Sequence, residues 1–220
     1  MRQTTGFSAL RRALLALPAA FTLWAVPARA AHEDTQLWLY FNGVVPLKDD
    51  ATATFEISPR VREAEGDVLL TRATVDIPAA DWATVGAGGA YIEFAGGREL
   101  RAHQQVTLTA GPLAFRTRVE QRFFEGEPRA QLRLRQRVAT SVRLAERTSL
   151  TGSAELLYIA RTENPEDEAR VDSWRALAGV QQRLSPNLTL GLNYLLMLSP
   201  RENAPDRLSH VPQVTLVFRP

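Results

Sequence analysis

From about residue 36 to its end, this sequence alternates between apolar and polar residues with a period of two. The clearest case is segment 129–138, in which apolar Ala130, Leu132, Leu134 and Val138 alternate with Arg129, Gln131, Arg133, Arg135 and Arg137. Successive side chains of a β-strand point to opposite faces, whereas a helix repeats every 3.6 residues. The pattern therefore predicts an all-β chain whose strands have one apolar and one polar face.

About eleven segments show this alternation, and turn-forming residues separate them. The segments begin near Gln36, Ala51, Asp67, Ala83, Glu99, Leu113, Arg129, Ser149, Trp174, Leu188 and His210. Most span about 10 to 13 residues, which fits a tilted membrane-crossing strand better than the shorter strands of soluble sheets. Within the second segment, Pro59 predicts a bulge or an early end, because proline cannot donate a ladder hydrogen bond.

The number and length of the segments predict a transmembrane antiparallel up-and-down β-barrel of about 10–12 strands. Single-chain barrels of bacterial outer membranes have an even number of strands, so we expect the count of eleven to be wrong by one. The long stretches 162–173 and 201–209 are expected outside the cell, and the tight turn Ser185-Pro186-Asn187 is expected on the periplasmic side.

Residues 1–30 have the features of a secretory signal peptide. Arg2, Arg11 and Arg12 precede an uncharged stretch over residues 13–26, and small residues lead up to Ala30. The uncharged stretch is shorter than the ~20 residues of a membrane-spanning helix, which argues against the alternative of a retained anchor. We therefore expect cleavage after Ala30, export through the periplasm to the bacterial outer membrane, and a barrel domain of residues 31–220.

The charge balance argues against a nucleic-acid partner. The chain has 26 basic and 24 acidic side chains, but four of the arginines lie within residues 1–30, so the exported part is slightly acidic. Cysteine is absent, which excludes disulfides and thiolate metal sites. Lys48 is the only lysine. The basic groups are therefore almost all guanidinium groups, which can hold a carboxylate through two parallel hydrogen bonds.

Two architectures fit the alternation. In a membrane barrel the apolar faces meet lipid and the arginines point inward, whereas a soluble periplasmic barrel has the reverse arrangement. An arginine that faces lipid at mid-membrane costs roughly 2 to 4 kcal/mol, so the row Arg133, Arg135 and Arg137 must point inward in a membrane barrel. Eleven strands with large apolar side chains would overfill a small soluble barrel, and this favours the membrane barrel.

Two further features also favour a membrane barrel. Aromatic residues near segment ends are typical of the belts at a membrane surface, and here they are Trp82, Phe123, Phe124, Tyr158 and Trp174. The last segment carries Val214, Leu216 and Phe218 on one face, an ending common in proteins inserted into bacterial outer membranes. The expected partners are outer-membrane lipid, lipopolysaccharide and, during insertion, the barrel-assembly machinery.

The polar positions of the segments define the residues expected to line the lumen. They are Glu56, Arg60, Arg62, Arg72, Glu99, Arg101, His103, Gln105, Arg116, Arg118, Glu120, Arg122, Arg133, Arg135, Arg137, Glu155, Arg175 and Arg183. The glutamates are expected to form bidentate pairs with arginines on neighbouring strands. Because arginines outnumber carboxylates, an open lumen would favour anions, whereas an Arg–Glu network that fills the lumen would close it.

No catalytic residue, cofactor or metal site is expected. His103 shares the polar face of Glu99 and Arg101 and has no neighbouring serine, so a hydrogen-bonding role in the lumen outweighs that of a base in a lipid hydrolase. The three histidines do not have metal-ligand spacing. The acidic stretch 163–168 is expected to be a solvated loop rather than a cation site.

Several of these motifs resemble a family of bacterial outer-membrane barrels called domain of unknown function 2490. The resemblance rests on Trp38, Glu99-x-Arg101 with Gln105, Arg116-x-Arg118-x-Glu120-x-Arg122-Phe123, Arg133-x-Arg135-x-Arg137, Glu155, Arg175 with Gly179, Ser185-Pro186-Asn187 and His210. The run from Arg116 to Phe123 is the most specific of these motifs. Membership implies an outer-membrane barrel and implies no established activity.

The sequence thus favours a non-enzymatic outer-membrane barrel that acts as a small porin and prefers small anionic solutes. Two alternatives remain at this point. One is a closed structural or lipid-interacting barrel that does not conduct ions, and the other is a soluble periplasmic barrel that binds a ligand.

Overall fold

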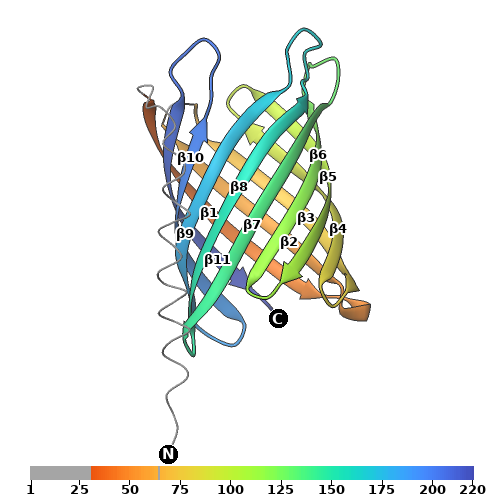
Figure 1. Cartoon of the computed structure of the whole chain (residues 1–220), viewed down its shortest axis with the longest axis vertical. Helices are drawn as coiled ribbons and strands as arrows, with labels where there is room; N and C mark the ends of the chain where they lie inside the picture. Colours follow the sequence, from red (N-terminus) through yellow and green to blue (C-terminus); the bar gives the residue numbers. More distant parts are fainter. Residues whose placement is uncertain (1–30, 64) are drawn as a thin grey trace, which may run out of the picture. The chain divides into compact units, whose positions relative to one another are not determined.

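A computed structural model describes residues 31–63 and 65–220, so the expected signal peptide in residues 1–30 lies outside the described residues. Within these described residues, eleven strands form one closed barrel (Figure 1). The strands are β1 (His32–Pro46), β2 (Thr52–Arg62), β3 (Val68–Ala80), β4 (Ala83–Phe94), β5 (Gly97–Ala110), β6 (Leu113–Phe124), β7 (Gln131–Ala145), β8 (Thr148–Arg161), β9 (Arg170–Arg183), β10 (Leu188–Ser199) and β11 (Arg207–Phe218). Each begins within four residues of its predicted start, which confirms the predicted all-β barrel.

The barrel closes between its first and last strands, and this pair is parallel. His32 of β1 lies opposite Arg207 of β11, and Gly43 lies opposite Phe218, so both strands start at the same end. Every other neighbouring pair is antiparallel. The expectation of an even number was therefore wrong. A parallel ladder pairs the two edge strands as an antiparallel one does, so an odd barrel leaves no open edge.

Pro59 neither ends β2 nor shifts its register. The β1–β2 register is the same on both sides of the proline, with Trp38 opposite Arg60 and Phe41 opposite Ile57. The residues between these pairs are not matched across the two strands, because proline has no N–H to donate. The predicted bulge or early end is thus replaced by a local gap in an otherwise regular ladder.

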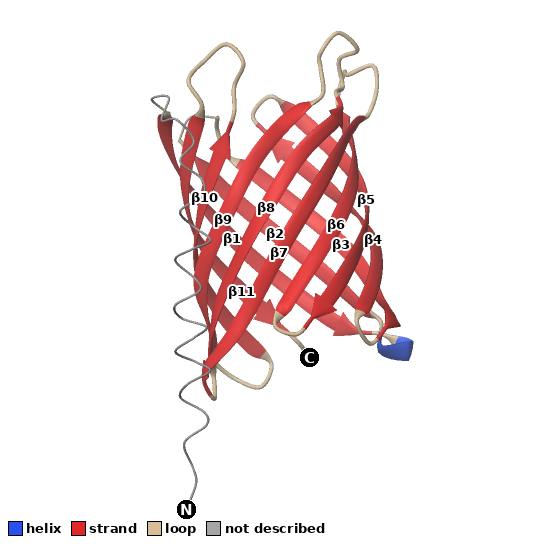
Figure 2. Ribbon diagram, viewed as in Figure 1, coloured by secondary structure: helices blue, strands red, loops and turns tan. Residues whose placement is uncertain are grey.

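The two ends of the barrel differ in the length of their connections (Figure 2). The connection between β2 and β3, the short turn 95–96 and the loops 125–130, 162–169 and 200–206 lie at one end, which we call the loop end. The turns 81–82, 111–112, 146–147 and 184–187 lie at the other, the turn end, as does the short 3-10 helix η2 (Lys48–Asp50). In outer-membrane barrels the shorter connections face the periplasm. The C-terminus lies at the turn end (Figure 1).

The apolar faces of the strands point outward and the polar faces point inward. Leu100, for example, is 58% exposed on β5, whereas the neighbouring Glu99 is 2% exposed. This arrangement is what a lipid-facing barrel requires, because apolar side chains are favourable in hydrocarbon and charged side chains are costly there. Among the described residues, the only helix is η2, and no helix is long and apolar enough to cross a membrane.

The aromatic belt follows the prediction only in part. Trp82 is exposed in the turn between β3 and β4, and Phe123 is exposed at the loop end of β6. Phe124 instead points inward and lies 4.6 Å below the guanidinium of Arg122. The expectation for Phe124 was wrong, because adjacent residues of a strand face opposite sides.

Two apolar patches interrupt the polar interior. One lies on the loop-end halves of β3 and β4 and comprises Val68, Leu70, Ala90 and Ile92, with Phe94 packed against it. The other lies on β1, β10 and β11 and comprises Trp38, Leu195, Met197 and Val211, with Tyr40 and Leu177 packed against it. We call them the β3–β4 patch and the Trp38 patch. The alternation of apolar and polar residues predicts neither patch.

Candidate functional site

The barrel interior contains two cavities that meet near its middle. The loop-side cavity has a volume of about 430 Å³ and reaches Ser199 and Arg207 at the loop end. The turn-side cavity has a volume of about 660 Å³ and reaches Gly111 and Pro112 at the turn end. Five side chains line both cavities, and we call them the central ring: Trp38, Tyr40, Arg72, Arg135 and Arg175.

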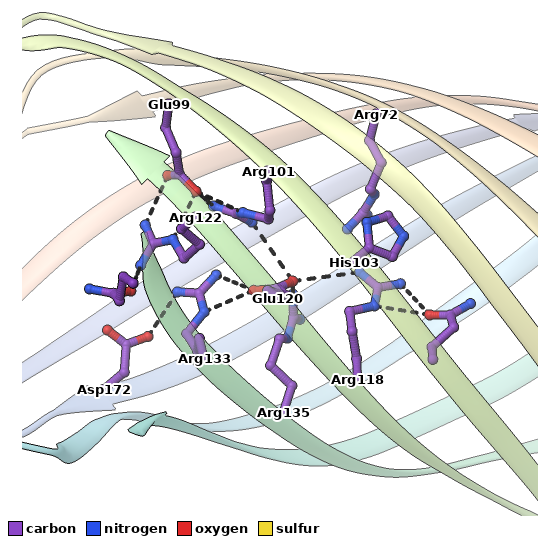
Figure 3. A network of polar contacts seen from close by, with 12 residues as sticks. Arg72, Glu99, Arg101, His103, Arg118, Glu120, Arg122, Arg133, Arg135 and Asp172 are labelled. Atoms are coloured by element: carbon purple, nitrogen blue, oxygen red, sulfur yellow. Dashed lines mark hydrogen bonds and ion pairs between the residues drawn. The ribbon is translucent and has the colours of Figure 1, made fainter. Parts of the chain in front are cut away.

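Glu120 is the centre of a buried network of charges on the wall of the barrel (Figure 3). It lies on β6, fully buried, and opposite Arg133 of β7. Its Oε2 atom accepts hydrogen bonds from Nε and Nη2 of Arg133 at 2.9 and 2.6 Å, and its Oε1 atom accepts one from Arg135 at 2.9 Å. The guanidinium groups of Arg101 and Arg118 lie 3.9 and 3.8 Å away. Four arginines therefore share one carboxylate.

Arg135 and Arg133 extend the network to β8 and β9. Arg135 donates from Nε and Nη2 to the carboxylate of Glu155, at 2.8 to 3.2 Å. Glu155 also accepts a hydrogen bond from Arg116 at 2.9 Å, and Arg133 donates to Asp172 at 3.1 Å. Such buried pairs are held by complete hydrogen bonding, so losing one partner leaves a costly unpaired charge.

Glu99 anchors the loop-end part of the same wall. Arg122 holds both carboxylate oxygens of Glu99, with Nε at 2.8 Å and Nη2 at 2.9 Å, in the bidentate geometry expected between neighbouring strands. Arg101, two residues along the same strand, donates to Oε1 at 2.8 Å. Arg122 also donates to Gln131, which in turn donates to Glu163 of the loop after β8.

A chain of hydrogen bonds from Arg118 through Gln105 to Asp76 extends the network to β3. Arg118 donates twice to the side-chain oxygen of Gln105, which donates to Asp76 at 2.6 Å. His103 is buried beside this chain, with Nε2 lying 3.1 Å from the hydroxyl of Thr74. The contact fits the predicted hydrogen-bonding role of this histidine.

Two glycines on β4 make room for these side chains. A Cβ at Gly88 would lie 2.1 Å from the carbonyl oxygen of Ala73 and 2.8 Å from the ring of His103. A Cβ at Gly86 would lie 2.0 Å from a carboxylate oxygen of Asp76. Glycine within a strand commonly marks such close approach. The glycine-rich stretch 86–89 is therefore a sequence signal for a packed wall at this position, which the alternation of apolar and polar residues does not reveal.

On the opposite wall, built around Trp38, arginines lie against aromatic rings. The guanidinium of Arg60 lies over the Trp38 ring at 4.1 Å and near the Tyr40 ring at 6.0 Å, while that of Arg175 lies 5.8 Å from Trp38. The indole N–H of Trp38 donates to Gln36 at 2.9 Å. Cation–π contacts stabilise a guanidinium in place without neutralising its charge.

Three arginines of the cavities have no carboxylate within 4 Å among residues 31–63 and 65–220. Arginines that line a cavity are Arg60, Arg62, Arg72, Arg101, Arg116, Arg122, Arg133, Arg135, Arg137, Arg175 and Arg207. All but Arg60, Arg137 and Arg175 form ion pairs. Arg137 and Arg175 both lie opposite Glu155, but Arg116 and Arg135 already occupy that carboxylate.

Of the eighteen residues expected to line the lumen, all but Arg183 are buried or half-buried in the barrel interior. Arg183 is exposed at the turn end, where it donates to the carbonyl of Glu146. His103, Gln105, Arg118 and Glu120 are packed in the wall and do not line either cavity. No group of three potential metal-ligating side chains occurs in the part of the chain that the structure describes.

Several residues that complete the interior are not among the predicted lumen residues. Asp76 and Asp172 hold Gln105 and Arg133, and Trp38 and Tyr40 form much of the central ring. Asp76 has the same parity as Arg72, so alternation could have identified it. Asp172 could not be found in this way, because it and Arg175 differ in parity. The β8–β9 ladder has a register shift close to Asp172.

A solved porin structure shares the fold of this barrel at low sequence identity. A solved structure of the NanC porin superposes with a TM-score of 0.54 at 12% identity, covering 76% of this chain and 84% of the porin. The outer-membrane expressed OmpT of Vibrio cholerae gives a TM-score of 0.40 at 13% identity, covering 70% and 57% of the two chains. Among curated proteins, none matches this sequence. A family profile matches residues 35–208, and the chain therefore belongs to the family described as Protein of unknown function (DUF2490).

Proposed function

We propose that this protein is a small, non-enzymatic outer-membrane pore that prefers anions. The observation that carries the proposal is the set of unpaired interior arginines Arg60, Arg137 and Arg175, one or more of which lines each cavity. Unpaired guanidinium groups along a narrow path attract anions and repel cations. Arg175 belongs to the central ring, so every solute that passes between the cavities would meet it.

The charge of both cavities supports the same preference. The turn-side cavity is lined by five arginines and two glutamates. The loop-side cavity is lined by nine arginines and three carboxylates, those of Glu65, Glu99 and Asp172. A confined region with an excess of one charge raises the local concentration of the opposite ion.

The proposed location is the bacterial outer membrane, reached by export through the periplasm. The outward-facing leucines, valines and phenylalanines support this location, because a lipid-facing barrel needs an apolar exterior. The proposed partners are outer-membrane lipid, lipopolysaccharide, the assembly machinery and small anionic solutes. The likeness to the NanC porin concerns the fold alone.

Ion selectivity tests the proposal. The purified protein is inserted into planar bilayers, and the reversal potential is measured in a KCl gradient. We expect a current carried mainly by chloride, and a shift towards cation permeability in the double variant Arg137→Gln/Arg175→Gln. The matched control is Arg147→Gln, an exposed arginine in the turn between β7 and β8, which is expected to leave selectivity unchanged. A cation-selective wild-type channel contradicts the proposal.

The second candidate function is that of a closed barrel that does not conduct ions. It is supported by the central ring, part of which is held in a fixed position. Arg72 and Arg135 of the ring are fixed by ion pairs to Glu56, Glu120 and Glu155, so part of the ring is held rigidly. A closed barrel predicts heat-dependent gel mobility, as expected of a folded barrel, with no current under any salt condition. That result would favour a structural or lipid-interacting role over conduction.

A further inference from the structure

We propose that the loop-side cavity binds an aromatic carboxylate, with the anionic group beside Arg60 and Arg175 and the ring on the β3–β4 patch. This inference rests on the proposed function and assigns a solute class to it. It goes beyond charge selectivity, because it requires a cation and an apolar surface at one place.

The arginines of the loop-side cavity differ in whether they are available to a ligand. Seven of its nine arginines are engaged in ion pairs. The other two are Arg60 and Arg175, and both lie against the ring of Trp38. Trp38 therefore brings together the two cations of this cavity that have no carboxylate partner among the described residues.

The donors of these two arginines are largely unused. Arg60 makes one side-chain hydrogen bond, from Nε to the hydroxyl of Ser58 at 3.4 Å. Arg175 makes none within the described ranges, and its Nε atom is buried without a partner. A carboxylate that accepts hydrogen bonds from both guanidinium groups would satisfy donors that the protein itself leaves free.

The β3–β4 patch continues directly from Arg60. Val68 lies opposite Arg60 in the β2–β3 ladder, and Phe94 lies opposite Val68 in the β3–β4 ladder. Leu70 and Ile92 form the next row of the same patch. Val68, Leu70, Ile92 and Phe94 all line the loop-side cavity. A ligand held at Arg60 therefore has an apolar surface within reach on the same wall.

The size and chemistry of the cavity suit a small planar ligand. A volume of about 430 Å³ is within the range of small-molecule sites, which combine apolar walls with a few convergent polar groups. A small hydrated anion with no apolar part, such as chloride, would leave the β3–β4 patch unused. The turn-side cavity also has apolar residues, such as Leu177 and Leu195, but Arg60 does not line it. The pair Arg60 and Arg175 therefore lies beside an apolar patch only in the loop-side cavity.

Three probes separate the charged and apolar parts of the proposed site. Calorimetric titration of the purified, detergent-solubilised barrel is carried out with benzoate, acetate and benzyl alcohol. We expect benzoate to bind at least about tenfold more tightly than acetate, because burial of its ring adds hydrophobic free energy. Benzyl alcohol, which lacks the charge, is expected to bind about tenfold more weakly than benzoate. Equal affinity for benzoate and acetate would overturn the proposal.

Variants locate the binding. Arg60→Gln is expected to weaken both benzoate and acetate, whereas Val68→Thr, which keeps the side-chain shape, is expected to weaken benzoate alone by about threefold or more. Ile92→Thr gives an independent test of the patch, and heat-dependent gel mobility reports whether each variant is folded. Arg147→Gln is the control and is expected to bind as the wild type does. Unchanged benzoate affinity in folded Arg60→Gln and Val68→Thr would place the binding elsewhere and overturn the proposal.

The calorimetric readout does not depend on ion conduction. Benzoate binding without any bilayer current would support the cavity as a site and contradict the pore. Anion-selective current without preferential benzoate binding would support the pore and overturn the assignment of the solute class.

Discussion

The two walls of the barrel interior use arginine in opposite ways. On the wall formed by β5 to β8, the arginines Arg101, Arg133 and Arg135 surround the buried carboxylate of Glu120. On the wall formed by β1 and β2, Arg60 lies over Trp38 with no carboxylate within 4 Å in the described part of the chain. On the first wall the arginines are held by ion pairs with a buried carboxylate. On the second wall the positive charge remains available to solutes. Arginine content alone would not distinguish them.

Removal of the Glu120 carboxylate should have the largest effect on the free energy of unfolding. Glu120→Gln leaves four nearby guanidinium groups without their shared counter-charge, and loss of one partner of a buried pair costs about 3 to 5 kcal/mol. The free energy of unfolding, measured by urea titration in detergent, should fall by that amount. The control Glu93→Gln, on the exposed face of β4, should change it by no more than about 0.5 kcal/mol. Similar losses in the two variants would refute the network's structural role.

Packing on the same wall should give a smaller effect. Gly88→Ala would place a methyl group against the carbonyl of Ala73 and the ring of His103, and overpacking of this kind costs about 1 to 3 kcal/mol. Gly43→Ala on β1 meets no atom within 4 Å and should be close to neutral. The comparison is read from the unfolding midpoints of both variants. A neutral Gly88→Ala would mean that β4 can move away from His103.

The unpaired arginines should contribute least to stability. Arg137→Gln removes a charge that forms no ion pair or side-chain hydrogen bond with the described residues, so its free energy of unfolding should change by no more than about 1 kcal/mol. Arg133→Gln, which loses its contacts with Glu120 and Asp172, should destabilise the barrel by about 3 kcal/mol or more. Equal destabilisation would remove the distinction between the paired and unpaired arginines.

Alternation predicted the strands, because each residue's face is a local property of the chain. The sequence could not show how an odd number of strands forms a closed barrel. Closure depends on the parallel pairing of β1 with β11, which are far apart along the chain. Parity also failed where both faces are apolar, as in Val68-Leu69-Leu70, so the β3–β4 patch was not predicted. Which arginines are paired depends on the register across strands, and a single strand does not encode it.

The orientation of the strands in a membrane underlies the proposed function, and cysteine labelling tests it most directly. The chain has no cysteine, so single substitutions report one position each. In proteoliposomes, Asn193→Cys and Thr151→Cys, which replace residues that line the turn-side cavity, should react with a charged thiol reagent that does not cross lipid. Leu192→Cys and Leu150→Cys, on the outward face, should be protected. Labelling of the leucine positions with protection of their neighbours would contradict an arginine-lined interior within a lipid-facing barrel.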